Sequence, residues 1–448
     1  MNRDAVAALR ARVGRNASLN LIGLAVPLGV AFFLLPTLTH ALGPARFGLL
    51  GMSWAFLEYL TLFDVGLGKA TVRYVADSLA RGTEDIPQIT SVSLAVQLAI
   101  GSAAGLALAL AAPAFARNVF RVDPALIPEA SRLFVVVGLN LPMVLAVTTL
   151  RGVLEGAQRF TISNALKIPT TAGAIVIPAV LATLGRSLPE MLLWVCAWRV
   201  LSALVTLYVI RRTIPGFRVE LPRDWRRLRG LISFGSWVAV SGVVSPMLIY
   251  FDRFALGARA GLTAVGYYTA PYEGVVRLLM IPNSFINALF PLLTGLGVAA
   301  AVTTIDKLFS SSMRALLLLM SVPAGIALLF APTILNLWMG PEYALHGAMA
   351  LRILALGVLI VSVAHIPYTF LEASGRPDIP AKFHLMELVF YVPLAWYLVG
   401  AFGITGAAIA WTIRVIVDTI LLLIAAQRVV GVSLLGVFMP QRAAMASA

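Results

Sequence analysis

Long apolar runs follow one another along this chain, separated by short stretches rich in glycine, proline and charged residues. Each run is about twenty residues or longer, which is enough for a helix to cross a hydrocarbon core of about 30 Å. Helices are expected rather than barrel strands, because a spanning strand is about half that length. The pattern predicts twelve spans, near residues 17–41, 46–67, 88–112, 132–151, 161–184, 189–210, 231–251, 263–290, 313–335, 347–370, 383–400 and 404–426.

Composition supports this prediction. The mean hydropathy is +0.92, 60% of the residues are hydrophobic and only 12% are charged. Soluble globular chains carry about 25% charged residues. The expected fold class is therefore all-α and integral to the membrane.

The chain offers little for metal, redox or covalent chemistry. Its one cysteine, Cys196, excludes an internal disulfide, and no Cys or His residues have the spacing of a metal site. We expect neither a metal nor another cofactor. No nucleophile and base pair, phosphate loop or paired-carboxylate motif indicates a catalytic site.

The distribution of Lys and Arg predicts the topology, because cytoplasmic loops retain basic residues. With the N-terminus inside, inner segments hold 23 of the 34 basic residues and outer loops hold seven. Both termini are then cytoplasmic. The net charge of +14 follows from this bias and from anionic inner-leaflet lipid, so membrane lipids are expected partners and nucleic acid is not. Seven arginines lie in the longest polar connection: Arg211, Arg212, Arg218, Arg223, Arg226, Arg227 and Arg229.

Two sequence stretches recur at nearly one offset. VLEGAQRF at 153–160 returns as FLEASGRP at 370–377, and Gly43 returns as Gly261, with a shift that is larger by a single position. Both pairs fall at equivalent places in the predicted topology. They indicate a duplicated unit of six helices.

Each unit begins inside and has six spans, so the two copies are parallel, as in transporters whose halves are related by an axis along the membrane normal. We expect an N-terminal bundle at 1–215, a basic cytoplasmic linker at 216–230 and a C-terminal bundle at 231–448. The bundles are expected to be pseudo-symmetric. The alternative is that glycine-rich loops and Leu-Glu pairs recur by chance in a biased composition.

The repeated stretches are expected to end the fourth helix of each half. Gly156 and Gly375 suit a helix stop, and Arg159 and Arg376 fit the positive-inside rule. Their role is then topological rather than catalytic.

Two further patterns concern packing. Gly101 and Gly105 place small residues on one helix face, which favours close contact with a neighbouring helix. The stretch LGKATVRYVADSLARG at 67–82 is amphipathic and is expected to lie along the membrane interface.

Several motifs resemble one known family. They are ALGPARFG with Gly43, Phe47 and Gly48, the stretch DVGLG that begins at Asp64, the stretch LEGAQRF, and YFDRFALG with Asp252 and Arg253. The chain resembles the bacterial polysaccharide transporters of the O-antigen flippase (Wzx-type) family. That family belongs to the multidrug, oligosaccharidyl-lipid and polysaccharide (MOP) exporter superfamily.

The resemblance implies a MATE-like fold with a V-shaped central cavity in the bacterial inner membrane. It also implies transport of a polyprenyl-pyrophosphate-linked oligosaccharide, such as an O-antigen or exopolysaccharide repeat unit, from the cytoplasmic to the periplasmic leaflet. Expected partners are this lipid-linked glycan and the polysaccharide polymerase or export machinery, with a monomer as the transport unit.

Charged residues inside the predicted spans are the candidates for function, since each costs about 2.5–3.5 kcal/mol in mid-bilayer unless it has a partner or a watery cavity. Glu273 and Arg277 are four residues apart, as are Arg414 and Asp418, so an ion pair within one helix is one interpretation of each. The other interpretation is a cationic cavity, because guanidinium matches the oxygens of a pyrophosphate headgroup.

On that second interpretation we expect four arginines to contact the anion: Arg199, Arg277, Arg352 and Arg414. Glu58 and Asp418 would orient them or bind sugar hydroxyls. Candidates for ion pairing or coupling are Glu273, Asp64, Glu387 and Asp252. A partner on another helix, such as Glu58, would instead neutralise Arg199 or Arg352.

Two alternatives to a flippase remain. A cation-coupled exporter of drugs or small solutes has the same fold, but such exporters typically carry an acidic residue in the first span, and residues 17–41 contain none. A membrane polysaccharide polymerase or ligase needs catalytic groups on a sizeable outer loop. The largest outer loop here, near 113–131, is short and lacks histidine.

Overall fold

A computed structural model of the chain describes residues 3–60, 67–82, 85–120, 122–214, 217–218, 220, 247–296 and 302–433, without the side chains of some of them, including residues 3–25 and Glu58. Within these ranges all regular structure is helical. The helices are α1 (Arg3–Leu60), α2 (Leu67–Arg81), α3 (Ile86–Ala114), η2 (Phe115–Val119), η3 (Pro124–Leu126), α4 (Ile127–Gly156), α5 (Phe160–Thr183), α6 (Leu188–Thr213), residues 247–259, α8 (Leu262–Val276), η4 (Arg277–Leu279), α9 (Met280–Leu296), α10 (Val302–Leu329), α11 (Ala331–Met339), α12 (Pro341–Ala373) and α13 (Asp378–Val430).

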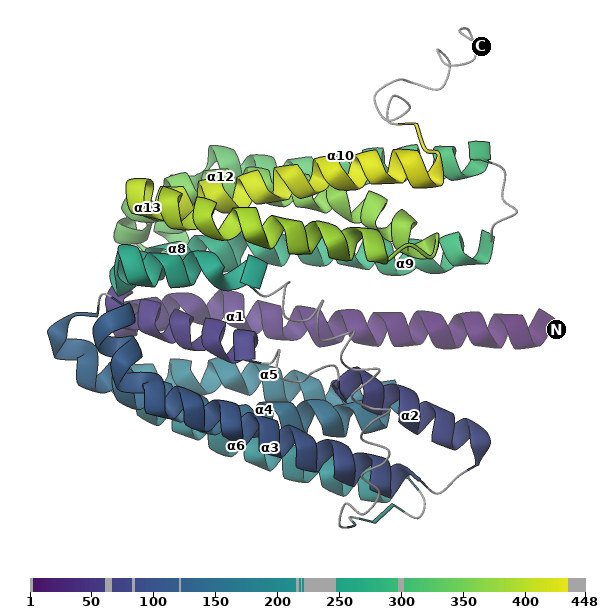
Figure 1. Cartoon of the computed structure of the whole chain (residues 1–448), viewed down its shortest axis with the longest axis horizontal. Helices are drawn as coiled ribbons and strands as arrows, with labels where there is room; N and C mark the ends of the chain where they lie inside the picture. Colours follow the sequence, from purple (N-terminus) through teal and green to yellow (C-terminus); the bar gives the residue numbers. More distant parts are fainter. Residues whose placement is uncertain are drawn as a thin grey trace, which may run out of the picture. The chain divides into compact units, whose positions relative to one another are not determined.

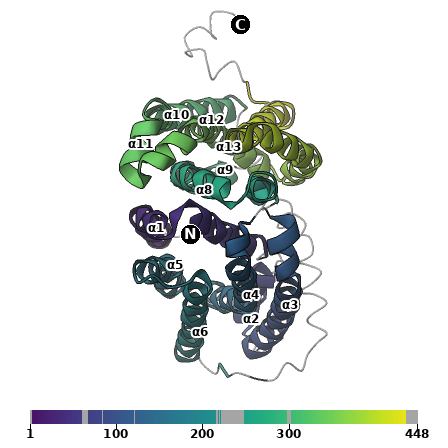
Figure 2. The same cartoon turned by 90° about the vertical axis from the view of Figure 1, so that its left-hand side faces the viewer.

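The chain divides into two units, and the N-terminal one comprises Met1–Tyr250 with Gly261–Thr263. Its central helix is α4, which packs against α3, α6 and the amphipathic α2 and also contacts α1 and α5 (Figure 2). α1 is two helices merged across Gly43, whose φ of 70° and ψ of 168° are not helical. This bend lies where the sequence predicted the first loop.

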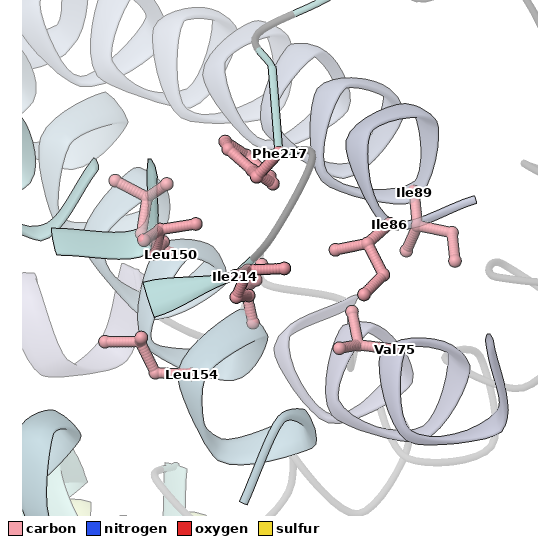
Figure 3. Close-up of a cluster of buried hydrophobic side chains, with 9 residues drawn as sticks. Val75, Ile86, Ile89, Leu150, Leu154, Ile214 and Phe217 are labelled. Atoms are coloured by element: carbon pink, nitrogen blue, oxygen red, sulfur yellow. The ribbon is translucent and has the colours of Figure 1, made fainter. Parts of the chain in front are cut away.

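Apolar residues from several elements close one end of the N-terminal unit. They come from α2, α3, α4 and α6 and from the chain just after α6, as Figure 3 shows for Val75, Ile86, Leu154 and Phe217. Burying apolar area in this way contributes about 25 cal/mol per Å². The cluster therefore fixes α2 against the long helices and holds the segment that leaves α6.

The C-terminal unit comprises Phe251–Ala260 and Ala264–Ala448. Its central helix is α12, which packs against α13, α10, α11 and α9 (Figures 1 and 2). α13 is again two helices merged across a glycine, Gly403, with a φ of 55° and a ψ of −128°. The two halves of α13 contain the predicted spans 383–400 and 404–426.

Close contact between α3 and α4 depends on glycine, as the sequence predicted. A Cβ atom on Gly105 would collide with the carbonyl oxygen of Gly138, and a Cβ on Gly101 would lie 2.7 Å from the Cα of Pro142. Both distances are shorter than real side chains tolerate. The two backbones touch directly at these positions.

The boundaries of the helices repeat at the offset found in the sequence. The end of α4 at Gly156 corresponds to the end of α12 at Ala373, and the end of α6 at Thr213 corresponds, with the same shift, to the end of α13 at Val430. Left-handed glycines also recur with one common shift, from Gly43 to Gly261 and from Gly185 to Gly403. The structure therefore has an internal repeat in its backbone, while the predicted bundle limits of 1–215 and 231–448 stay a prediction.

The two copies of the Leu-Glu stretch end their helices with the same hydrogen bonds. The backbone N–H of Arg159 donates to the carbonyl of Leu154 (2.8 Å), and that of Arg376 donates to Leu371 (3.0 Å). The left-handed residue of this helix stop is Gly375 in the second copy, with a φ of 76°.

The first copy differs from the prediction. The left-handed residue there is Gln158, with a φ of 56°, and not Gly156. Gly156 is instead required for packing, because a Cβ on it would lie 2.6 Å from the carbonyl oxygen of Val72 in α2. The second glycine of the pattern was predicted correctly, and the first has a different role.

Seven described helical segments are long and apolar enough to cross a membrane: Ile86–Val119, Pro124–Gly156, Phe160–Thr183, Leu188–Thr213, Ile305–Leu329, Pro341–Ala373 and Asp378–Val430. They correspond to eight of the twelve predicted spans, since Asp378–Val430 holds two. The predicted span 313–335 is too long at its C-terminal end, because α10 ends at Leu329 and α11 begins at Ala331. The other four, at 17–41, 46–67, 231–251 and 263–290, include residues or side chains outside the described part of the chain.

Candidate functional site

Charged and aromatic side chains from residues 251–259, α8, η4 and both halves of α13 meet inside the C-terminal unit. We call this group the charged cluster; it consists of Asp252, Arg253, Tyr268, Tyr272, Glu273, Arg277, Glu387, Tyr391, Arg414 and Asp418. Charges inside an apolar helical protein need partners, because an isolated buried charge is strongly unfavourable. The contacts within the cluster show how each charge is satisfied.

Asp252 and Arg253 form the most buried part of the charged cluster, with side chains 0% and 2% exposed. The carboxylate of Asp252 accepts a hydrogen bond from the hydroxyl of Tyr268 and another from the backbone N–H of Arg253 (2.7 Å). The guanidinium of Arg253 lies over the ring of Tyr272, 4.4 Å from its centroid. Such contacts stabilise a charge that water does not reach.

Glu273 joins two arginines. One carboxylate oxygen, Oε1, accepts from Nη2 of Arg253 at 2.9 Å, and the other, Oε2, accepts from Nη2 of Arg277 at 3.1 Å. The Glu273 side chain is 29% exposed, Arg277 is 18% exposed and Arg253 is 2% exposed. The ion-pair chain therefore runs from the protein interior towards a more accessible end at Arg277.

A second charged group lies on α13. Arg414 Nη1 lies 3.5 Å from Glu387 Oε2, with side chains 11% and 2% exposed, and Asp418 interacts electrostatically with Glu387. The guanidinium of Arg414 is 5.8 Å from the centre of the Tyr391 ring. Glu387 and Arg414 lie on opposite sides of Gly403, so the bend in α13 brings them together.

Aromatic rings connect these groups. Tyr272 and Trp411 meet edge to face with centroids 6.0 Å apart. The Tyr391 hydroxyl and the Trp411 Nε1 are buried and have no hydrogen-bond partner among the described residues. Each is a donor that an oxygen atom at this place would satisfy.

The formal charges of the cluster do not sum to a positive value. It contains four carboxyl groups and three guanidinium groups, so it carries one negative charge if all are ionised. Each of the three arginines has a carboxylate within ion-pair distance. An anion would therefore have to compete with carboxylates that are already bound.

Arg199 belongs to the N-terminal unit, on α6. Its Nη1 donates to the Oδ1 atom of Asn140 on α4 at 3.0 Å. Asn140 is fully buried, and its amide nitrogen donates to the carbonyls of Val136 (3.1 Å) and Leu192 (3.3 Å). Asn140 thus orients the half-buried Arg199 guanidinium through a neutral acceptor.

Family comparison decides the affiliation of the chain. The family described as polysaccharide biosynthesis protein matches residues 13–296. The chain belongs to this family. The resemblance to polysaccharide transporters, predicted from short motifs, is thereby confirmed.

Two proteins with related names are similar to this chain in sequence. A putative O-antigen transporter of Shigella flexneri is 29% identical over 411 residues, which cover 91% of this chain and 96% of that protein. A probable low-salt glycan biosynthesis flippase of Haloferax volcanii is 24% identical over 199 residues, covering 44% of this chain and 42% of that protein.

Solved structures show the same fold. An inward-facing multidrug resistance MATE family transporter of the MOP superfamily has a TM-score of 0.78 and 15% identity, and the match covers 93% of this chain and 98% of that one. A MOP superfamily transporter from Pyrococcus furiosus has a TM-score of 0.66 and 15% identity over 94% and 95% of the two chains. The predicted MATE-like, all-α membrane fold is confirmed.

The structure brings together six of the ten predicted site residues. Arg277, Arg414, Asp418, Glu273, Glu387 and Asp252 lie in the charged cluster. Arg352, on α12, is exposed and donates to the carbonyl of Leu328 (3.2 Å); no ion pair between described residues joins it to the cluster. The side chain of Glu58 and the whole of Asp64 lie outside the described residues.

Spacing predicted one ion pair and missed another. Glu273 and Arg277 form the expected pair. For Arg414, the ion pair recorded among the described residues is with Glu387, in the first half of α13, rather than with Asp418. Helical spacing is local, so it does not reveal a partner that a bend in the chain brings back.

Arg253 and the tyrosines were missed. The sequence named Asp252 as a candidate for ion pairing but not Arg253, and it placed both just beyond the predicted span 231–251. Helix 247–259 continues past them and buries both. Tyr268 and Tyr272 are four residues apart and would face one side of a helix. That spacing beside an Asp-Arg pair was the available signal.

Proposed function

We propose that the protein is a flippase for a polyprenyl-pyrophosphate-linked oligosaccharide, such as an O-antigen or exopolysaccharide repeat unit, and that it moves this unit from the cytoplasmic to the periplasmic leaflet by alternating access. Membership of the polysaccharide biosynthesis family and the full-length similarity to a putative O-antigen transporter support this proposal. It is a transporter rather than an enzyme. The location would be the bacterial inner membrane, with both termini cytoplasmic.

The observation that carries the proposal is guanidinium held inside apolar helices. Arg277 and Arg199 are both partly accessible, Arg277 at the end of an ion-pair chain and Arg199 beside a neutral amide. Guanidinium keeps its proton and offers paired donors to phosphate oxygens. We propose that these two arginines contact the pyrophosphate, while Arg414 and Arg352 have supporting roles.

The lipid part of the substrate needs no cavity. A long prenyl chain is already soluble in the bilayer, so only the polar headgroup and its sugars have to cross. In this proposal the prenyl chain stays in lipid while the headgroup crosses. Aromatic and carboxylate groups such as Tyr391, Trp411 and Asp418 are suited to sugar hydroxyls.

The test is reconstitution of the full chain into liposomes with a defined polyprenyl-pyrophosphate oligosaccharide. Flipping is measured as exposure of the sugar to a lectin added outside. We expect Arg277→Ala and Arg199→Ala each to lower the flipping rate at least about tenfold, the effect of losing one charge-assisted contact. The exposed Arg259, which stacks on Trp396, provides the control variant Arg259→Ala.

Full flipping by both alanine variants would reject the two arginines as anion contacts. Absence of flipping by the wild type, together with efflux of cationic drugs, would reject the flippase and favour the exporter of the same fold. Lysine at either position should restore part of the rate if charge alone matters, and none if paired donors matter.

A further inference from the structure

Glu273 occupies the place on Arg277 that a phosphate oxygen would need. Its Oε2 atom takes one donor of the guanidinium, Nη2, at 3.1 Å. The Nε of Arg277 is buried and has no hydrogen-bond partner among the described residues. Of the guanidinium donors, Nη2 is therefore held by Glu273, while the buried Nε has no acceptor among the described residues.

The two ends of the Glu273 bridge differ in burial. Arg253, at one end, is 2% exposed and is held over the ring of Tyr272, so its contact with Oε1 has little freedom to break. Arg277, at the other end, is 18% exposed. An incoming anion can therefore replace Oε2 on Arg277 while Oε1 stays on Arg253.

This arrangement keeps the displaced carboxylate close. Because Arg253 still holds Oε1 of Glu273, the carboxylate stays next to Arg277. It can bind Arg277 again when the anion leaves. It also keeps Arg277 neutralised in the absence of substrate, which a cation among apolar helices requires. The same contact then weakens binding of an anion and assists its release.

We propose that Glu273 is a resident competitor for the anionic headgroup: it is exchanged on Arg277 for the phosphate when substrate binds, and it displaces the phosphate again on release. This inference rests on the proposed function, because it assumes an anionic headgroup as the substrate. Glu273 is a positioning residue here, since it acts on the substrate through Arg277. No bond is made or broken except hydrogen bonds and ion pairs.

The first test measures binding of inorganic pyrophosphate to the purified full chain by calorimetry at constant ionic strength. Glu273→Gln removes the competing charge and should bind pyrophosphate at least about tenfold more tightly than the wild type, the size of one charge-assisted hydrogen bond. Glu342→Gln is the matched control. It removes the same charge elsewhere in the C-terminal unit, where Glu342 accepts from the Tyr267 hydroxyl at 2.9 Å, and it should leave the affinity unchanged.

The second test separates competition from support of the fold. Glu273→Gln should flip the lipid-linked oligosaccharide severalfold more slowly than the wild type although it binds pyrophosphate more tightly, because release is no longer assisted. A residue that only supports the fold would lower both affinity and rate. The double variant Glu273→Gln with Arg277→Ala should lose the gain in affinity.

Equal pyrophosphate affinities of Glu273→Gln and Glu342→Gln, with normal flipping by the wild type, would overturn the competitor and leave the flippase standing. Absence of flipping by the wild type would overturn the proposed function itself. If Glu273→Gln does not fold, Glu273→Asp takes its place: the shorter side chain cannot reach both arginines, so affinity should rise about two- to threefold. An unchanged affinity of that variant also overturns the proposal.

Discussion

Arg414 lies beside two buried carboxyl groups, and its removal should be costly. Glu387 is 3.5 Å from it and Asp418 is one helical turn further along α13. We expect Arg414→Met to lower the free energy of unfolding by about 3–5 kcal/mol, because it leaves buried acids without their cation. The loss is read as a fall in the melting temperature of the detergent-solubilised protein.

The control for this prediction removes both partners. Arg414→Met combined with Glu387→Met should be more stable than Arg414→Met alone, since a buried pair replaced by apolar side chains of similar volume is often neutral. Asp418→Asn removes one of the four carboxyl groups that face three guanidinium groups in the charged cluster. It should change the melting temperature little. If the single and double variants melt together, the Arg414 and Glu387 pair does not stabilise the fold.

Single residues also mark the limit of what the sequence could predict. Glu273 and Arg277 could be paired from their spacing, because helix geometry alone places them together. The contact of Arg199 with Asn140 could not, because it depends on how α4 packs against α6. Partners on one helix follow from local periodicity, whereas partners on different helices require the tertiary structure.

At the level of helices, the contact between α3 and α4 allows a direct test. Gly105→Ala would bring a Cβ atom against the carbonyl oxygen of Gly138, so the helices must separate. We expect a loss of about 1–3 kcal/mol in the free energy of unfolding, which is typical of overpacking. The measurement is again the melting temperature.

Gly325, in α10, provides the matched control, because a Cβ added to it meets no atom within 4 Å. Gly325→Ala should raise the melting temperature slightly, since alanine favours a helix by about 1 kcal/mol over glycine. An equal fall in the melting temperature of both variants would show that the backbone contact of Gly105 with Gly138 is not the cause of the loss.

Helices were predicted well where apolar runs are long and are interrupted by glycine or charge. The stops at Gly43 and Gly375 followed from this pattern. The stop at Gln158 did not, because Gly156 packs against α2 and the left-handed residue lies two positions later. Glutamine rarely adopts a positive φ, so nothing in the sequence indicated a helix stop at this position.

For the whole chain, the internal repeat predicts that the two halves can be made separately. Co-expression of residues 1–230 and 231–448 should restore roughly half or more of the flipping measured for the intact chain, because each half would form its own core. A cut between Tyr250 and Phe251 is the control. It interrupts helix 247–259 and should abolish flipping.

If both pairs of fragments fail equally, the covalent connection is required and the bundle limits of 1–215 and 231–448 are wrong. If both succeed equally, helix 247–259 tolerates the break, and the two cuts do not distinguish the predicted linker from the boundary between Tyr250 and Phe251. Transport by the first pair alone supports a boundary in the predicted linker at 216–230.

The glycine contact between α3 and α4 also has a mechanical consequence. At Gly105 and Gly138 the two backbones touch without side chains between them, so we expect the pair of helices to resist sliding. We expect bending to be concentrated at positions such as Gly43 and Gly403, where the backbone already departs from helical φ and ψ angles. If the protein is the proposed flippase, we expect its conformational change to be centred on such glycines, with α3 and α4 moving together.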